Sequence, residues 1–288
     1  MRGSVVEMSE LEADYVSPFL VSVIVPAFNE EENIPTCVQE LSDATRRAGY
    51  KSEIIVVNDG STDNTLSVSR SIQGKCSMLR VLDLGRNYGK ATALREGVRA
   101  SKGDVIAFFD ADMQYSPEDL VRLVESAKDG IDIVTGRRDY RFYEQSRTVL
   151  SKTYNTVLKL IFKITVNDSN CGMKVIMRRA ADPSIMFRYG VPLMAPLLRA
   201  KGFKFEEVMV SLRKRKSGKS KFFKDGSFLG GWNHMREISF HSVALLALIA
   251  NLTIELLWKR LQRFSIANPL EFLHMLYSKE GLDLERRE

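Results

Sequence analysis

The chain has 288 residues, of which 44% are hydrophobic, and this is ample for one large α/β domain or two small ones. A chain too polar to form a core is therefore excluded. The net charge of +6 and the pI near 9.1 suit nucleotides, phospholipid headgroups or nucleic acid, and charge alone does not choose among them.

The N-terminal part carries no signal-peptide pattern. Residues 1–17 include four acidic side chains, and the apolar run over 19–25 is short and ends at Pro26. We expect residues 1–17 to form a flexible segment. Three widely separated cysteines support neither a disulfide framework nor a cysteine-rich zinc site, and they favour a reducing, cytoplasmic setting: Cys37, Cys76 and Cys171.

Short apolar runs then alternate with helical stretches, a pattern typical of a mostly parallel sheet flanked by helices. The predicted strands are 21–25, 53–57, 78–82, 105–109 and 131–135, and the predicted helices are 30–48, 62–73, 90–101 and 117–128. Ser116 at the N-cap and Pro117 at the first helical position mark the start of the last helix.

Beyond Gly136 the pattern changes. We expect a helix over 145–164 and strands near 173–177 and 204–210, followed by the basic loop RKRKSGKSK at 213–221. The catalytic domain is predicted to cover 18–225, and a helical region 226–288. Residues 240–258 have the length of a membrane span, yet they include a glutamate, so an interfacial helix or a homo-oligomer contact is the alternative.

Polar residues follow the predicted strands at the edge where parallel sheets bind ligands. Asp110 and Asp112 come directly after the fourth strand in the motif DADMQ. Their carboxylates suit Mg²⁺ or Mn²⁺ carrying a diphosphate, and Gln114 adds a neutral oxygen. The alternative is that the two acids only cap the next helix.

Two further strand exits are distinctive. Asp59 follows the second strand in VVNDGS, where a carboxylate can accept hydrogen bonds from a base or ribose, and an Asx turn without a ligand is the alternative. Ser61 or Thr62 can cap the helix that follows. The first exit, PAFNE at 26–30, suits a nucleobase edge, with capping of the next helix by Asn29 as the alternative.

The motifs PAFNE, VNDGSTD, RNYGKATALREG and DADMQ, in this order, together resemble family 2 glycosyltransferases, and in particular the polyprenyl-phosphate (dolichyl-phosphate) hexose synthases. The resemblance covers about residues 20–225. It implies a GT-A fold, which is a Rossmann-like, mostly parallel sheet flanked by helices, with a C-terminal helical segment.

Site residues follow from this resemblance position by position. It implies that the nucleoside contacts Pro26, Phe28, Glu30 and Asp59, that the rest of the donor contacts Lys90, Asp110, Ala111, Asp112, Arg215 and Lys221, and that Asp110, Asp112 and Gln114 hold the metal. The catalytic set that it implies is Asp112, Asp168, Arg137 and Arg147.

Arginine donates bidentate hydrogen bonds to phosphate, so Arg137, or its neighbour Arg138, and Arg147 are candidate clamps for an acceptor phosphate. Simple solvation at the surface is their alternative. The basic loop at 213–221 is otherwise a solvated or nucleic-acid-binding segment, but its RxxGxSK pattern favours phosphate. Asp168 has a positioning role or an optional role as a base.

The sequence therefore predicts metal-dependent, inverting transfer of a hexose from a GDP- or UDP-sugar to a polyprenyl monophosphate at the cytoplasmic face of a membrane. A family 2 transferase acting on a polysaccharide or another acceptor is the runner-up, although the QxxRW motif of processive polymerases is missing. A non-catalytic nucleotide-sugar scaffold is a further alternative. No nucleic-acid partner is expected, because no RNA-binding motif occurs.

Overall fold

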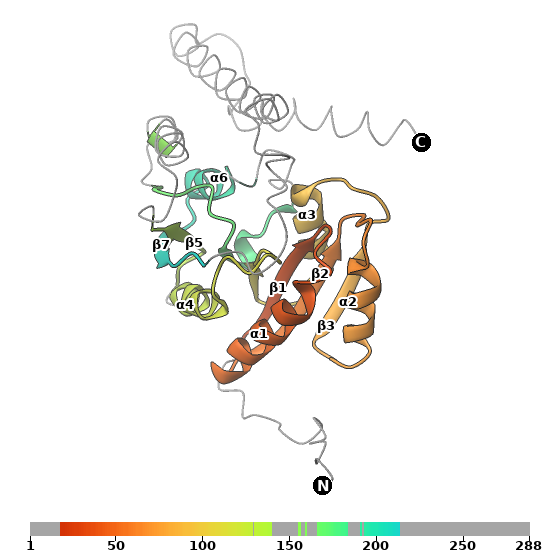
Figure 1. Ribbon diagram of the computed structural model, residues 1–288. Coiled ribbons are helices and arrows are strands. Elements are labelled where there is room, and N and C mark those ends of the chain that lie inside the picture. Colours follow the sequence, from red (N-terminus) through yellow and green to blue (C-terminus); the bar gives the residue numbers. More distant parts are fainter. Residues whose placement is uncertain are drawn as a thin grey trace, which may run out of the picture. The chain divides into compact units, whose positions relative to one another are not determined.

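The computed structural model describes residues 18–213, except 129, 140–154, 157–158, 160–165, 184–190 and 192 (Figure 1). The elements run in the order β1 (Leu20–Ala27), α1 (Ile34–Arg47), β2 (Lys51–Asn58), α2 (Thr65–Gln73), β3 (Leu79–Asp83), α3 (Lys90–Ala100), β4 (Val105–Phe108), α4 (Pro117–Lys128), β5 (Ile133–Arg138), β6 (Lys174–Met177), the 3₁₀ turn η2 (Arg178–Ala180), α6 (Met194–Ala200) and β7 (Phe205–Val210).

The strands form one seven-stranded sheet in the order β3-β2-β1-β4-β6-β5-β7. The pairs β1–β2, β2–β3, β1–β4 and β5–β7 are parallel, whereas β6 runs antiparallel to both β4 and β5. The predicted mostly parallel sheet flanked by helices is confirmed. Its apolar runs are continuous because the central strands are buried on both faces.

Each face of the sheet has its own apolar core. Val21, Val23 and Val25 of β1 pack into the core beneath α1 and α4, whereas Ile24 packs into the core beneath α3 and α6. Figure 1 shows these helices on opposite sides of the strands. This alternation follows from the two-residue period of a strand, and it decides which face of the sheet each side chain reaches.

The predicted elements agree with the structure to within one or two residues, except at two helix starts, at β5, which runs over 133–138 rather than 131–135, and at α6, which was not predicted. The helices predicted from 30 and 62 begin at Ile34 and Thr65, because the residues before them form loops that hydrogen-bond to each other. The predicted start of α4 is confirmed: it begins at Pro117, and Ser116 Oγ accepts the Glu118 N–H (3.2 Å).

Several sequence predictions lie outside the described residues. These are the segment 1–17, most of the helix over 145–164, the basic loop from 214 onward and the region 226–288 with the candidate span 240–258. Of the predicted helix, residues 155, 156 and 159 are described and are helical. Within the described part of the chain, no helix is long and apolar enough to cross a membrane.

Candidate functional site

The exits of β1 and β2 are joined into one unit by side-chain hydrogen bonds. The Asn29 N–H donates to Ser61 Oγ (3.0 Å), and Asn29 Oδ1 accepts the Thr62 N–H (2.7 Å). The Glu30 N–H donates to Thr65 Oγ1 (2.7 Å). Asn29 adopts a left-handed conformation with φ of 53°, which asparagine tolerates better than most residues. PAFNE and NDGSTD therefore form a single surface at the carboxyl edge of the sheet.

The helix caps considered as candidates at these two exits do not form. The N-cap of α1 is Asn33 rather than Asn29, and the N-cap of α2 is Asn64 rather than Ser61 or Thr62. Both helices start too late for the predicted caps to reach their first free N–H groups. The side chains of Asn29, Ser61 and Thr62 tie the two loops together instead.

The three residues expected to contact the nucleoside at the first exit, Pro26, Phe28 and Glu30, are all half-buried. Pro26 lies opposite Val57, one residue before the parallel pairing with β2 ends at Ala27. Glu30 Oε2 accepts a hydrogen bond from Asn33 Nδ2 (2.6 Å), which orients the carboxylate. These side chains share one edge of the sheet, and their contact with a nucleoside stays a prediction.

Asp59 binds the protein's own backbone. It is 3% exposed, and its two carboxylate oxygens accept the N–H groups of Tyr88 (2.7 Å) and Gly89 (2.9 Å). Burial raises the pKa of this carboxyl above its usual value, although the two N–H donors oppose the shift. The predicted Asx turn forms at its neighbour, where Asn58 Oδ1 accepts the Ser61 N–H (3.3 Å).

Gly60 lets this second exit approach the loop at 85–89. It adopts a φ of 65°, and an ideal Cβ there would lie 2.2 Å from the Arg86 carbonyl carbon. A larger residue would be both strained and obstructed. Asp59 and Gly60 thus hold the loop whose next residue, Lys90, begins α3.

The motif DADMQ forms a tight turn after β4. Met113 adopts a φ of 58°, and Asp112 Oδ1 accepts the Gln114 N–H (3.2 Å). A left-handed methionine is uncommon, and such strain gathers at functional sites. Ala111 is buried in the core, so the two acids on either side of it stand at the edge. Lys90 Nζ donates to Asp110 Oδ1 at 2.5 Å.

This turn fits a divalent cation that also binds a substrate phosphate. Asp110 already attracts a cationic group, the ammonium of Lys90. Among the described residues there is no group of three or more His, Cys, Asp or Glu residues that could hold a metal. Mg²⁺ in nucleotide sites is commonly held by one or two carboxylates and completes its shell with phosphates and water. Asp110 and Asp112 supply that number of carboxylates, and their binding of an ion stays a prediction.

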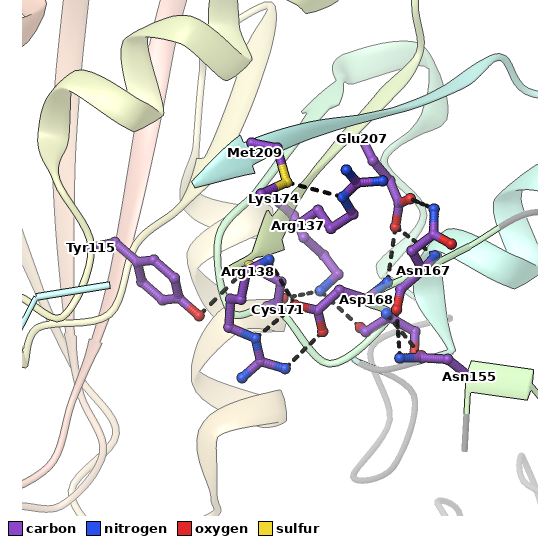
Figure 2. Close-up of polar contacts among 11 residues, drawn as sticks. Tyr115, Arg137, Arg138, Asn155, Asn167, Asp168, Cys171, Lys174, Glu207 and Met209 are labelled. Carbon is purple, nitrogen blue, oxygen red and sulfur yellow. Dashed lines mark hydrogen bonds and ion pairs between the residues drawn. The ribbon is translucent and has the colours of Figure 1, made fainter. Parts of the chain in front are cut away.

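The two arginines that end β5 have opposite environments. Arg137 is exposed, and its Nε lies 3.0 Å from Met209 Sδ on β7. Arg138 is largely buried and donates from Nε and a terminal nitrogen to the two oxygens of Asp168, both at 2.7 Å (Figure 2). Asp168 is fully buried, so its carboxylate is used to hold Arg138.

Residues 166–173, which we call the anchored loop, are held by buried polar groups. Glu207 Oε1 accepts the N–H groups of Asn167 (2.7 Å) and Asp168 (2.9 Å). From the other side, Asn155 Nδ2 donates to the Asn167 carbonyl (2.6 Å) and Asn155 Oδ1 accepts the Ser169 hydroxyl (2.7 Å). Figure 2 shows these side chains converging on the loop from several elements.

Lys174 completes the anchoring from the first position of β6. Its Nζ is fully buried and donates to the carbonyl oxygens of Ser169 (3.1 Å) and Cys171. Cys171 Sγ in turn donates to the Tyr115 hydroxyl (3.6 Å). Burial lowers the pKa of Lys174 to about 8.

Comparison with known proteins identifies the family of the chain. Residues 22–184 match the family model described as Glycosyl transferase family 2. The chain belongs to glycosyl transferase family 2.

Curated relatives of this family 2 chain are identical to it at about a third of the aligned positions. An undecaprenyl-phosphate 4-deoxy-4-formamido-L-arabinose transferase of Pseudomonas paraeruginosa is 32% identical over 207 residues, which cover 70% of this chain and 60% of the relative. The same enzyme of Pectobacterium atrosepticum is 32% identical over 204 residues, with 70% and 62% coverage. The chain thus spans about 60% of the length of these relatives.

Solved structures confirm the predicted GT-A fold. Glucosyl-3-phosphoglycerate synthase from Mycobacterium tuberculosis, solved with Mn²⁺, UDP and phosphoglyceric acid, has a TM-score of 0.55 and 19% identity, covering 81% of this chain and 78% of that one. The same enzyme with glucosyl-3-phosphoglycerate has a TM-score of 0.53 and 20% identity, with 81% and 80% coverage. At this identity the likeness extends to the fold alone.

Some residues of this site in the family 2 chain were not predicted from the sequence, and some residues that were predicted lie outside the described part of the structure. Arg147, Arg215 and Lys221 lie outside the described residues and stay predictions. Sequence reasoning missed Lys174 and Glu207. A lysine at the start of the apolar run KVIM was a usable signal, because a charged residue in a buried strand needs specific partners. Glu207 lies in FEEVMV, where the sequence offers no comparable signal.

Because of Lys174, the free energy of unfolding is expected to vary with pH in the alkaline range. Its folded pKa of about 8 lies below its ordinary 10.5, so between these values the unfolded chain binds a proton that the folded chain lacks. Its contribution to stability is therefore present above the ordinary value and is lost as pH falls through about 8. The free energy of unfolding of wild type minus that of Lys174→Met should rise with pH, measured by denaturant unfolding. Parallel pH profiles would contradict the assignment.

Thr135 offers a stabilising substitution. Of the buried side-chain nitrogens and oxygens in the described residues, only Thr135 Oγ1 lacks a hydrogen-bond partner. Thr135→Val removes the unpaired hydroxyl at nearly constant shape, so we expect the free energy of unfolding to rise by about 1 kcal/mol. Thr45→Val is the matched control: its buried hydroxyl donates to the Leu41 carbonyl (2.9 Å), and its loss should lower the same quantity by about 1 kcal/mol in urea unfolding.

Proposed function

We propose that this chain transfers a hexose-type sugar from a nucleoside diphosphate sugar to a polyprenyl monophosphate. The bond between the anomeric carbon and the diphosphate breaks, and a bond from an acceptor phosphate oxygen to that carbon forms with inversion. The nucleoside diphosphate leaves. The observation that carries the proposal is the turn after β4 at the carboxyl edge of the sheet, where Asp110 pairs with Lys90 and Asp112 follows two residues later.

On the donor side, Asp110 and Asp112 would hold Mg²⁺ or Mn²⁺, with Gln114 next to them. When bound, such an ion neutralises the charge that develops on the departing diphosphate. Lys90 stands 2.5 Å from Asp110 and is available to a phosphate oxygen near the same carboxylate. Asp59 keeps Lys90 in position by holding the backbone of the two residues before it.

The base of the donor would rest on the joined loops of β1 and β2. Phe28 and Glu30 supply an aromatic ring and an oriented carboxylate at this surface. Both UDP- and GDP-sugars fit these residue types. The glucosyl-3-phosphoglycerate synthase of similar fold was solved with UDP and Mn²⁺, which supports a nucleotide and a divalent ion of this general kind.

On the acceptor side, a phosphate monoester has its second pKa near about 6, so it is largely a dianion at neutral pH and needs no strong base. Asp168, buried against Arg138, would therefore act as a positioning residue. Arg137 is exposed at the end of the same strand and would bind the acceptor phosphate. The relatives named undecaprenyl-phosphate transferases support a polyprenyl rather than a polysaccharide acceptor.

A polyprenyl acceptor would bring the chain to the cytoplasmic face of a membrane. The excess of basic residues suits an anionic lipid surface. The basic loop over 213–221 is the segment expected to contribute most of this attraction.

The decisive experiment incubates the purified full chain with polyprenyl phosphate in detergent, a panel of UDP- and GDP-sugars, and Mn²⁺ or Mg²⁺. Mass spectrometry of the lipid fraction should show one product heavier than the lipid by a single sugar residue. The product should vanish when the lipid is omitted or EDTA is added. Phosphoglyceric acid, which is bound in a solved structure of similar fold, serves as a water-soluble phosphate comparison.

Sugar transfer to phosphoglyceric acid but not to polyprenyl phosphate would overturn the lipid acceptor. Transfer that persists unchanged in EDTA would overturn the metal. Absence of any product or hydrolysis with every donor of the panel would overturn the transferase assignment itself.

A further inference from the structure

Gly172 lies directly against the carboxylate of Asp110. An ideal Cβ built on Gly172 would lie 2.5 Å from Asp110 Oδ2, 3.2 Å from its Cγ and 3.4 Å from Lys90 Nζ. Non-bonded carbon and oxygen atoms do not approach as closely as 2.5 Å. Any side chain at position 172 must therefore displace a neighbouring atom. Position 172 thus touches both partners of the ion pair in the donor site.

The backbone at this position does not require glycine. Gly172 is not among the glycines with a positive φ, so alanine would fit its backbone conformation without strain. Glycine is needed here for space alone. This separates Gly172 from Gly60, where conformation and space both exclude a side chain.

The anchored loop that carries Gly172 is poorly able to move away. Its backbone is held by Glu207 at residues 167 and 168, by Asn155 at residues 167 and 169, and by Lys174 at the carbonyls of residues 169 and 171 (Figure 2). These anchoring groups are buried or part-buried, and breaking a buried hydrogen bond costs more than rotating a partly exposed side chain. The carboxylate would therefore yield to a new methyl group.

Asp110 is confined on two sides. Gly172 limits the position of Oδ2, and Lys90 holds Oδ1. Its side chain is 25% exposed, so solvent reaches it only in part. The Asp110 carboxylate is therefore restricted to a small volume, bounded by the anchored loop on one side and by Lys90 of α3 on the other.

We propose that Gly172 is a positioning residue for donor binding: by leaving space beside Asp110 it sets the place of the carboxylate that holds the divalent ion. This rests on the proposed function. The anchored loop directly precedes β6, whereas Asp110 follows β4 and Lys90 begins α3, so a segment distant in the sequence determines the geometry of the proposed metal site.

Gly172→Ala is expected to weaken the binding of Mn²⁺ by about 10-fold to 100-fold, the usual effect of disturbing the support of a metal ligand. Mg²⁺ should be affected at least as strongly, because it tolerates little departure from octahedral geometry. The matched control is Gly74→Ala, where the new Cβ meets the carbonyl oxygens of Ser71 and Arg70 at ordinary distances of 3.6 and 3.9 Å.

The experiment measures free Mn²⁺ by electron paramagnetic resonance during titration of the full chain, alone and with UDP or GDP. Circular dichroism verifies that each variant is folded at the temperature used. Weaker Mn²⁺ binding in Gly172→Ala, with Gly74→Ala like wild type, supports the proposal. Equal binding in wild type and Gly172→Ala overturns it. If wild type itself retains no Mn²⁺ under any condition, the proposed metal site fails together with this inference.

A thermal double-mutant cycle tests the contact itself without metal. Gly172→Ala should lower the melting temperature by about 2–10 °C in the wild-type background, because it overpacks the site. In the Asp110→Ala background the carboxylate is gone, so the same substitution should cost clearly less. An equal loss in both backgrounds would show that the methyl group meets some other part of the protein and would overturn the assigned contact.

Discussion

Asp112→Ala is expected to lower sugar transfer by at least about 100-fold while the chain stays folded. The turn after β4 offers only two carboxylates, so losing one removes half of the charge that would hold the ion at the donor diphosphate. Removing one group that stabilises charge in a transition state commonly costs about 100-fold to 1,000-fold in rate. Transfer is measured as the initial rate of lipid product formation with saturating donor.

The control for this prediction is Asp43→Ala on α1. Asp43 is a partly exposed carboxylate that pairs with Arg46 on the surface of the same helix. Surface pairs of this kind contribute little, so both activity and stability should stay near those of wild type. Unchanged metal-dependent transfer in Asp112→Ala would refute the metal assignment, and equal losses in both variants would point to a general effect of reduced negative charge.

Arg138→Met is expected to lower the free energy of unfolding by about 3–5 kcal/mol. The substitution leaves Asp168, which has no exposed surface, as a buried carboxylate without its bidentate partner. Desolvation of that unpaired charge is the physical reason for the loss. Urea unfolding followed by circular dichroism measures it.

Arg137→Met is the matched control, because it changes the adjacent arginine of the same strand at an exposed position. Stability should change by less than about 0.5 kcal/mol. Activity should nevertheless fall, since Arg137 is the proposed contact of the acceptor phosphate. A small stability loss in Arg138→Met, similar to that of Arg137→Met, would show that the buried pair does not hold the anchored loop.

The family resemblance correctly anticipated the family but did not distinguish the two arginines. Arg137 and Arg138 are adjacent in the motif GRR, and the sequence alone does not show which of them is buried. Strand alternation turns one to the surface and the other toward Asp168, and the direction depends on which face of β5 is covered. For Asp59, the sequence did not reveal that its carboxylate accepts the N–H groups of residues 88 and 89, and its predicted contact with a nucleoside stays a prediction.

The sequence by itself determined the α/β class, the order of the strands along the chain, the start of α4 and the acidic turn after β4. These are local properties: apolar runs report burial, and caps and turns need only neighbouring residues. Tertiary structure alone decided that β6 enters the sheet antiparallel between β4 and β5. Tertiary structure also decided that Gly172 lies beside Asp110 and that Asp168 pairs with Arg138. Such contacts join residues that lie far apart along the chain, and their pairing depends on how whole elements pack, which no local pattern records.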